Sequence, residues 1–264
     1  MTLLEVTGLS KRFGGVQAVQ DCSLGVDRGE VVGLIGPNGA GKSTVITLVS
    51  GFAVSDAGRV KFDDLDITRQ PAHVRARHGL LRTFQLARVW GRLSVMENML
   101  VAGSQSRRES LWRQFAAPRR QMREEALDRE RAREILNEYQ LLRLKDLPAE
   151  QLSGGQKRLL EFARIMMAKP RLVLLDEPSA SLSPVMSERI GESILRLVGS
   201  GIAVLLVEHD LPLVEATCSR IVCMAGGRII AEGSMESLRR NELVVEAYLG
   251  AAVEERAIAQ AGLN

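Results

Sequence analysis

The amino-acid sequence predicts an α/β fold with a mostly parallel core sheet, an N-terminal antiparallel β subdomain and an α-helical subdomain. Continuous apolar runs at residues 31–35, 172–175 and 202–207 are typical of buried central strands. Helical patterns separate these runs, and repeated alternation of strand and helix favours a parallel sheet. The first thirty residues instead alternate apolar and polar side chains, which is typical of antiparallel strands.

Composition excludes several classes of protein. The 264 residues are 45% hydrophobic and 25% charged, close to globular averages, and the net charge of +3 is too small to indicate a nucleic-acid partner. The three cysteines have no C-x-x-C spacing, so we expect reduced thiols in a cytosolic protein. No run approaches the ~20 apolar residues of a membrane span. If the protein works at a membrane, another chain supplies the spanning helices.

The elements follow one another in a regular order. Strand patterns in the first thirty residues are broken by Gly14-Gly15 and by Asp27–Gly29, and the buried strand Val31–Ile35 then ends in glycines. A helix is predicted from Lys42 to Gly51, because its apolar residues are spaced for one face and it stops at glycine. Strand, glycine loop and helix together are the setting of a phosphate-binding loop.

Three further helical regions are predicted, two before the second apolar run and one after it. Between Leu100 and Tyr139, many arginines alternate with acidic residues around few apolar ones, which predicts long solvated helices. A specific lipid or protein contact is the alternative for its arginine-rich part, residues 107–133. Helices are also predicted after Ser153, at Lys157–Ala168, and at Val185–Leu197.

The glycine loop fits the phosphate-binding pattern G-x-x-x-x-G-K-[ST] completely. Backbone N–H groups of such a loop and of the helix that follows bind phosphate oxygens. We expect Lys42 to contact the β and γ phosphates of ATP and Ser43 to ligate Mg²⁺. The predicted nucleotide-binding residues here are Gly36, Pro37, Asn38, Gly39, Ala40, Gly41, Lys42, Ser43 and Thr44.

A pair of carboxylates ends the apolar run 172–175. Asp176 and Glu177 would lie at the carboxyl edge of a parallel sheet, where ligands bind. Such a pair can also cap a helix or form a turn. With the phosphate-binding loop upstream, we expect Asp176 to face the Mg²⁺ shell and Glu177 to reach the attacking water.

A third motif carries a family resemblance. Leu152-Ser153-Gly154-Gly155-Gln156 before a helix resembles the signature sequence of ATP-binding cassettes. The resemblance implies a P-loop NTPase cassette whose α-helical signature subdomain contacts ATP held by a second cassette. A helix N-terminus can face a γ-phosphate in this way. Ser153, Gly154, Gly155 and Gln156 are therefore predicted to contact nucleotide across a dimer.

The resemblance assigns roles to three isolated residues. Gln85 is similar to the glutamine of the cassette Q-loop, which implies a part in catalysis and in binding the metal ion. His209 resembles the switch histidine, so the predicted catalytic residues are Glu177, His209, Lys42 and Gln85, and the metal ligands are Ser43, Gln85 and Asp176. Phe13 lies where cassettes stack an aromatic ring on adenine.

The likeness extends from Leu3 to Gly250 and is to the cassettes of branched-chain amino acid importers and their urea or amide relatives. It implies one ATPase domain at 1–250, with a helical lobe at about 86–168, and a polar tail at 251–264. The motifs that carry it are Phe13-Gly14-Gly15, Arg82–Gln85, Ser94–Asn98 and Ala247–Gly250.

The implied protein is a Mg²⁺-dependent ATP hydrolase on the cytoplasmic face of the inner membrane. Its implied partners are a second cassette, transmembrane permease subunits and an extracytoplasmic substrate-binding protein, with no nucleic acid. Two alternatives stay open: the ATPase of an exporter such as a lipopolysaccharide transporter, and a soluble cassette ATPase outside transport. The sequence departs from the family at Ser183, where an Asp or Asn usually connects the two cassettes, so intersubunit coupling is in question.

Overall fold

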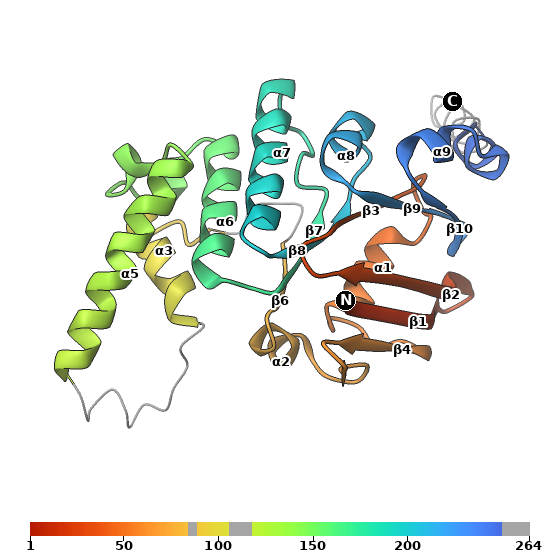
Figure 1. The fold of residues 1–264 in the computed structure, drawn as a ribbon, viewed down its shortest axis with the longest axis horizontal. Coiled ribbons are helices and arrows are strands. Elements are labelled where there is room, and N and C mark those ends of the chain that lie inside the picture. The colour runs from red at the N-terminus through yellow and green to blue at the C-terminus, as the bar shows by residue number, and fades with distance from the viewer. Residues whose placement is uncertain (84–88, 106–117, 250–264) are drawn as a thin grey trace. The chain divides into compact units, whose positions relative to one another are not determined.

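The computed structural model describes residues 1–83, 89–105 and 118–249 (Figure 1). The chain divides into two compact units. The first unit consists of Met1–Arg82, Arg171–Ser179 and Ile194–Asn264, and the second of Thr83–Pro170 and Ala180–Ser193. Each unit has its own packing and is described separately.

The first unit contains the predicted antiparallel sheet. Its strands are β1 (Thr2–Phe13), β2 (Val16–Asp27), β4 (Ala57–Phe62) and β5 (Leu65–Asp66), in the order β2-β1-β4-β5. Leu4 of β1 lies opposite Val26 on one side and Phe62 on the other, and all three side chains are buried. The alternating pattern thus places one face of this sheet in the core.

The same unit contains the core sheet, in the order β10-β9-β3-β8-β7-β6. The strands are β3 (Val31–Ile35), β6 (Leu80–Arg82), β7 (Leu172–Asp176), β8 (Ala203–Val207), β9 (Arg220–Ala225) and β10 (Arg228–Gly233). All pairs are parallel except β9 with β10. Every residue of β3, β7 and β8 is buried, so the mostly parallel core sheet is confirmed.

The helices of the first unit are short. They are α1 (Lys42–Val49), α2 (Ala72–Arg77), α8 (Leu211–Thr217) and α9 (Met235–Arg239), and residues 242–249 are also helical. The helix α7 (Pro184–Gly199) has residues in both units. No helix in the part of the chain that the structure describes has the length and apolar character needed to cross a membrane.

A buried arginine completes the packing of α1. Arg75 of α2 is 1% exposed, and its guanidinium donates hydrogen bonds of 2.7 to 2.9 Å to the main-chain oxygens of four residues, Leu48, Val49, Thr68 and Gln70. Two of these acceptors are in the last turn of α1, where helix carbonyls have no partner within the helix. Burial lowers the pKa of Arg75 to about 10. Gly51, two residues after α1 ends, has φ of +78°, and a Cβ there would lie 2.7 Å from Arg75 Nε, so glycine suits this position.

The second unit is built from α3 (Val95–Gln105), α5 (Pro118–Glu138) and α6 (Gly154–Ala168), with 3-10 turns at Leu142–Leu144 and Ala149–Gln151. The start of α3 explains the Ser94–Asn98 motif. Ser94 Oγ accepts from Glu97 N at 3.1 Å while Glu97 Oε2 accepts from Ser94 N at 2.7 Å, which is a capping box. The buried Asn98 side chain binds both the N–H and the carbonyl of Trp90.

The structure changes two boundaries within this unit. The helix after Ser153 begins at Gly154, three residues before the predicted Lys157, because Ser153 caps it directly. The predicted helical region 100–139 is divided between α3 and α5. Arg107, Arg108 and Arg113 of its arginine-rich part lie outside the described residues.

Candidate functional site

The predicted phosphate-binding loop connects β3 to α1 in the first unit. Gly36 has φ of +147°, and a Cβ there would lie 2.1 Å from the carbonyl oxygen of Met224 in β9. Gly41 has φ of +102°, and its Cβ would lie 2.4 Å from the carbonyl oxygen of Ala18 in β2. Both positions therefore exclude any side chain. The loop lies so close to two strands that only glycine fits at its two ends.

Lys42 is the first residue of α1 and is 6% exposed. Its ammonium group donates to the loop's own carbonyls, at 2.7 Å to Gly36 O and 2.9 Å to Pro37 O. Burial lowers its pKa, and the charges of Glu177 and Asp176, together with Cys223, act in the opposite direction. Lys42 is thus close enough to the two predicted carboxylates, Asp176 and Glu177, for their charges to act on it.

Asp176 ends β7 and is 4% exposed. Its Oδ2 accepts from Arg82 Nη2 at 3.0 Å, whereas no donor among the described residues reaches the buried Oδ1. An unsatisfied buried carboxylate oxygen is costly unless a ligand completes it. Oxygen donors such as this one and the exposed hydroxyl of Ser43 are what Mg²⁺ prefers. The residues present therefore fit a magnesium ion.

Glu177 follows Asp176 with φ of +48°, an uncommon conformation for a residue with a side chain. Its N–H donates to Val207 O at 2.9 Å, which ties it to the end of β8. Its Oε1 lies 3.4 Å from His209 Nδ1, and the histidine side chain is about half exposed while that of Glu177 is mostly covered. Two residues predicted to be catalytic thus lie side by side at the carboxyl edge of the sheet.

The structure adds two residues that motif analysis did not assign. Glu208 is fully buried and accepts from Ser179 N at 2.8 Å and His209 N at 3.1 Å, so it fixes the backbone two residues after Glu177 and at His209 itself. A carboxylate directly after the apolar run 202–207 was the available signal. No local sequence pattern signals the contact between Arg82 and Asp176, because the two residues are 94 positions apart in the chain.

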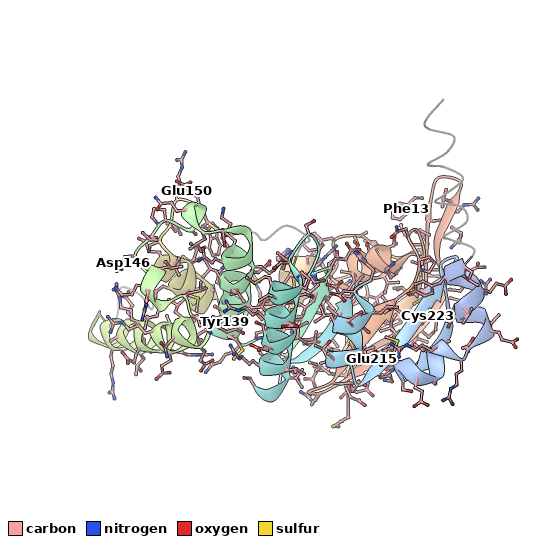
Figure 2. The ribbon with its side chains drawn as sticks, turned by 90° about the horizontal axis from the view of Figure 1, so that it is seen from above. Phe13, Tyr139, Asp146, Glu150, Glu215 and Cys223 are labelled. Carbon is pink, nitrogen blue, oxygen red and sulfur yellow. The ribbon has the colours of Figure 1, made fainter. Side chains whose placement is uncertain are left out.

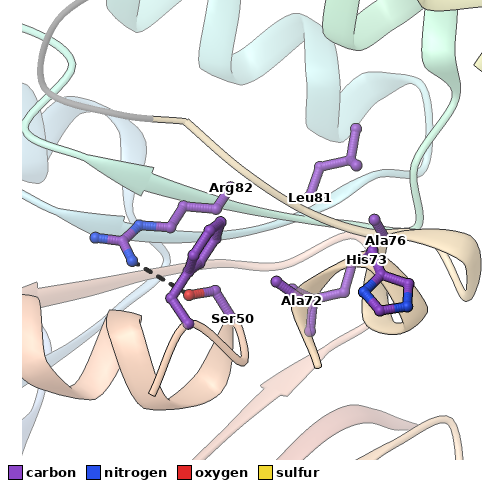
Figure 3. Close-up of a pocket in the computed structure, with 8 residues that line it drawn as sticks. Ser50, Ala72, His73, Ala76, Leu81 and Arg82 are labelled. Carbon is purple, nitrogen blue, oxygen red and sulfur yellow. Dashed lines mark hydrogen bonds between the residues drawn. The ribbon is translucent and has the colours of Figure 1, made fainter. Parts of the chain in front are cut away.

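Arg82 also lines a cavity of about 440 Å³ in the first unit (Figure 3). Its Nη1 donates to Ser50 Oγ and Thr47 Oγ1, both at 3.2 Å, and its guanidinium carbon lies 5.6 Å from the centre of the Phe52 ring. One guanidinium therefore connects Asp176 with the cavity wall. The cavity is lined by Ser50, Phe52, Ala72, His73, Ala76, Leu80, Leu81 and Arg82.

Phe13 lies at the end of β1 with 52% of its surface exposed (Figure 2). The ammonium of Lys11 is 5.5 Å from the centre of its ring. An exposed ring of this kind is free to stack on a base, which is what the sequence predicts for it. Gln85, the remaining residue predicted for catalysis and the metal, lies outside the described residues.

The signature motif belongs to the second unit and begins α6. Ser153 Oγ accepts from Gln156 N at 3.3 Å, and Gln156 Oε1 accepts from Ser153 N at 2.9 Å. The Ser153 hydroxyl still has its own proton to donate to a ligand. Gly154 is exposed with no heavy atom near its Cβ position, whereas a Cβ on Gly155 would lie 2.6 Å from Met186 Cε. The motif therefore builds an exposed helix N-terminus that suits an anion.

Ser183, the departure from the family pattern, is exposed and directly precedes α7. Its carbonyl accepts from Met186 N and Ser187 N, both at 2.9 Å, and Pro184 is the first helical residue. Serine, aspartate and asparagine are all favoured at this helix-capping position. The substitution is thus compatible with the local fold, and its effect on coupling between cassettes stays a prediction.

Known proteins resemble this chain over most of its length. The ABC transporter family model matches residues 19–180, and a model described as branched-chain amino acid ATP-binding cassette transporter matches residues 228–254. The chain is 41% identical over 251 residues to a probable branched-chain amino acid transport ATP-binding protein, LivG, of Archaeoglobus fulgidus, covering 95% of this chain and 96% of the relative. It is 38% identical to the lipopolysaccharide export system ATP-binding protein LptB of Escherichia coli, covering 95% and 98%.

A solved structure shows the same fold. An ATP-binding cassette of an ABC transporter, crystallised in its ADP conformation, superposes with a TM-score of 0.79 at 34% identity, covering 95% of this chain and 99% of that chain. Together with the loop, the paired carboxylates and the signature helix, these likenesses identify the enzyme class. The chain belongs to the ABC transporter family, as an ATP-binding subunit that hydrolyses ATP.

Proposed function

We propose that this chain powers the import of branched-chain amino acids or related small amides. The observation that carries the proposal is the match of residues 228–254 to the branched-chain amino acid cassette model. The likeness to LivG over nearly the whole chain supports it. The likeness to LptB keeps export of lipopolysaccharide as the second candidate.

The geometry supports a division of roles within the first unit. Lys42 leaves the carbonyls of Gly36 and Pro37 to bind the β and γ phosphates, and the amides of the loop and of α1 bind the remaining oxygens. Ser43 and Asp176 would hold Mg²⁺, with Gln85 as the third ligand that the family resemblance implies, and the ion would neutralise charge on the phosphates. Phe13 stacks on the adenine ring.

Glu177 acts as the general base. Its covered carboxylate takes a proton from the attacking water, and its backbone is held by Val207. His209, whose Nδ1 lies 3.4 Å from Glu177 Oε1, orients that carboxylate and donates to the γ-phosphate. Positioning and charge neutralisation supply most of the rate enhancement in phosphoryl transfer.

The active site is completed by a second cassette. In the proposed dimer, Ser153, Gly154, Gly155 and Gln156 at the start of α6 present their donors to the γ-phosphate of ATP bound by the partner. Hydrolysis removes that phosphate and opens the dimer. The opening drives transmembrane permease subunits, which receive the substrate from an extracytoplasmic binding protein, while this chain remains on the cytoplasmic face of the membrane.

The purified chain should hydrolyse ATP at a rate per molecule that rises with protein concentration. The reason is that each active site needs Ser153 of the second cassette, so only the dimer hydrolyses ATP. Steady-state ATPase measured over a hundredfold dilution series should show the rise, and Ser153→Ala should lower the rate at the plateau. A specific activity that does not change across the series would show a self-sufficient monomer.

The transport proposal is tested on the assembled complex. Affinity-tagged chain purified from detergent-solubilised membranes should bring with it two permease subunits. After reconstitution into liposomes, ATPase activity should rise with a binding protein loaded with leucine and not with the empty binding protein. Stimulation by lipopolysaccharide instead would establish the export alternative, and purification of the chain without any membrane protein would contradict both.

A further inference from the structure

The guanidinium of Arg82 connects two residues that are predicted to hold Mg²⁺. Its Nη2 donates to Asp176 Oδ2 at 3.0 Å. Its Nη1 donates to Thr47 Oγ1, and to Ser50 Oγ as Figure 3 shows, at 3.2 Å in both cases. Thr47 Oγ1 in turn donates to the main-chain oxygen of Ser43 at 2.6 Å. Arg82 thus contacts one predicted metal ligand directly and the main chain of the other through a single hydroxyl.

The hydroxyl groups in this network have a fixed direction. Thr47 gives its proton to the carbonyl of Ser43, and Ser50 gives its proton to the carbonyl of Ile46 at 2.7 Å. A hydroxyl has a single proton to donate, so both oxygens accept from the guanidinium of Arg82, which is a donor only. Donors and acceptors therefore match at each of these contacts, and such a network holds its members in place.

The bond with Arg82 decides which oxygen of Asp176 is left for a ligand. Oδ2 accepts from Arg82, whereas no donor in the described part of the chain reaches the buried Oδ1. A carboxylate held through one oxygen presents the other in a fixed direction, as hydrogen-bond partners of metal ligands commonly ensure. Asp176 ends β7, Ser43 lies in the first turn of α1, and Arg82 at the end of β6 is bonded to both elements.

We propose that Arg82 is a positioning residue that sets the orientation of Asp176 relative to Ser43 for binding of the metal ion. The inference rests on the proposed Mg²⁺ site, and it gives a role to the first residue of the Arg82–Gln85 motif. A guanidinium suits this role because its planar fork donates in two directions at once, whereas an ammonium is a point charge on a flexible stem. Arg82 acts through Asp176 and Thr47 and touches neither nucleotide nor metal.

Orientation and charge act in opposite directions on a bound cation. The side chain of Arg82 is only 11% exposed, so its positive charge is poorly screened and repels a metal ion. The orientation of Asp176 favours the ion, and loss of a hydrogen-bond partner of a metal ligand costs about 10- to 100-fold in metal affinity. A variant without the guanidinium therefore binds metal more weakly if orientation dominates, as we propose, and more tightly if charge dominates.

The test measures binding of Mn²⁺, which accepts the same oxygen ligands as Mg²⁺ and is detected by electron paramagnetic resonance. The full chain is kept in excess over AMP-PNP, a non-hydrolysable analogue of ATP, so that the nucleotide is bound to protein. Arg82→Met should raise the dissociation constant for Mn²⁺ by at least about tenfold. Arg82→Lys should do the same, because it keeps the charge and loses the fork. The affinity for AMP-PNP in EDTA should change little in both variants.

Thr47→Val tests the second arm of the network with a side chain of nearly the same shape. It removes the hydroxyl between Arg82 and Ser43 and leaves the bond between Arg82 and Asp176 in place. Mn²⁺ binding should therefore weaken by a smaller factor, about fivefold, as expected for a lost hydrogen bond. Mn²⁺ binding equal to that of the unmutated chain would remove Ser43 from the inference.

Arg171→Met is the matched control. The guanidinium of Arg171 also pairs with an aspartate, Asp63 at 2.5 Å, and lies 5.5 Å from the centre of the Phe62 ring in the same unit. This variant should bind Mn²⁺ and AMP-PNP as the unmutated chain does. An equal loss of Mn²⁺ affinity in Arg171→Met would overturn the inference.

Two further results would also contradict it. One is unchanged or tighter Mn²⁺ binding in Arg82→Met or Arg82→Lys. The other is a loss of AMP-PNP affinity in EDTA as large as the loss for Mn²⁺, because that result describes a residue that only supports the fold. Asp176→Asn is measured alongside: if it binds Mn²⁺ normally, the proposed metal site itself is wrong.

Discussion

Glu177→Gln should lower steady-state ATP turnover by a factor of about 10² to 10³ while ATP still binds. A general base contributes a factor of this order, and an amide keeps the shape of the carboxylate but cannot take the proton of water. The change leaves the backbone contact of residue 177 with Val207 in place. The ATP-bound dimer should therefore accumulate, which size-exclusion chromatography with ATP detects.

Glu215→Gln is the matched control for this substitution. Glu215 lies on α8 in the same unit (Figure 2). Its side chain is about half exposed and pairs with Arg239 at 2.6 Å. Exposed ion pairs contribute little to stability, so this variant should turn over ATP at the normal rate. Hydrolysis by Glu177→Gln at a rate near that of Glu215→Gln would remove Glu177 from the mechanism.

Lys42→Ala should weaken ATP binding by about 100-fold, or about 3 kcal/mol, because it removes the cation nearest the β and γ phosphates. The free protein should remain folded, since the substitution also removes a buried charge, and among the described residues its ammonium donates hydrogen bonds to two loop carbonyls. A fluorescent nucleotide titration measures the loss, and a thermal melt shows that folding is intact.

Lys61→Ala provides the control for charge alone. Lys61 lies on β4 and forms an exposed pair with Glu5 at 3.3 Å. Both variants lower the net charge by one, so a general electrostatic effect would weaken both equally. Equal affinities for ATP in Lys42→Ala and the unmutated protein would contradict the assignment of the phosphate-binding loop.

The elements that the sequence predicted well are those specified by neighbouring residues. The run Val31–Ile35 is a strand with the predicted bounds, because its four apolar side chains, on both sides of Gly33, can all be buried only in a sheet covered on both faces. The order of the strands had no such local signal. β3 lies between β8 and β9, which come from the far end of the chain.

The same division holds for the candidate site. The loop around Lys42, the pair Asp176 and Glu177, and the motif at Ser153 are each contiguous, and their chemistry follows from residue type and spacing. The anchors that hold them are distant in sequence. Arg82 reaches Asp176 only once the sheet has formed, so residue patterns could not assign this contact.

The buried arginine beneath α1 has a consequence for the field at the nucleotide. An α-helix carries partial positive charge at its N-terminus and partial negative charge at its C-terminus, and the eight residues of α1 span only about 12 Å. The guanidinium of Arg75 binds carbonyls of the last turn and masks the negative pole. Burial lowers its pKa, and no acidic side chain among the described residues pairs with it to cancel the charge. For the phosphate groups of a nucleotide at its N-terminus, α1 therefore acts less as a dipole and more as a single positive charge. The attraction between a single charge and a phosphate falls off more slowly with distance than that of a dipole.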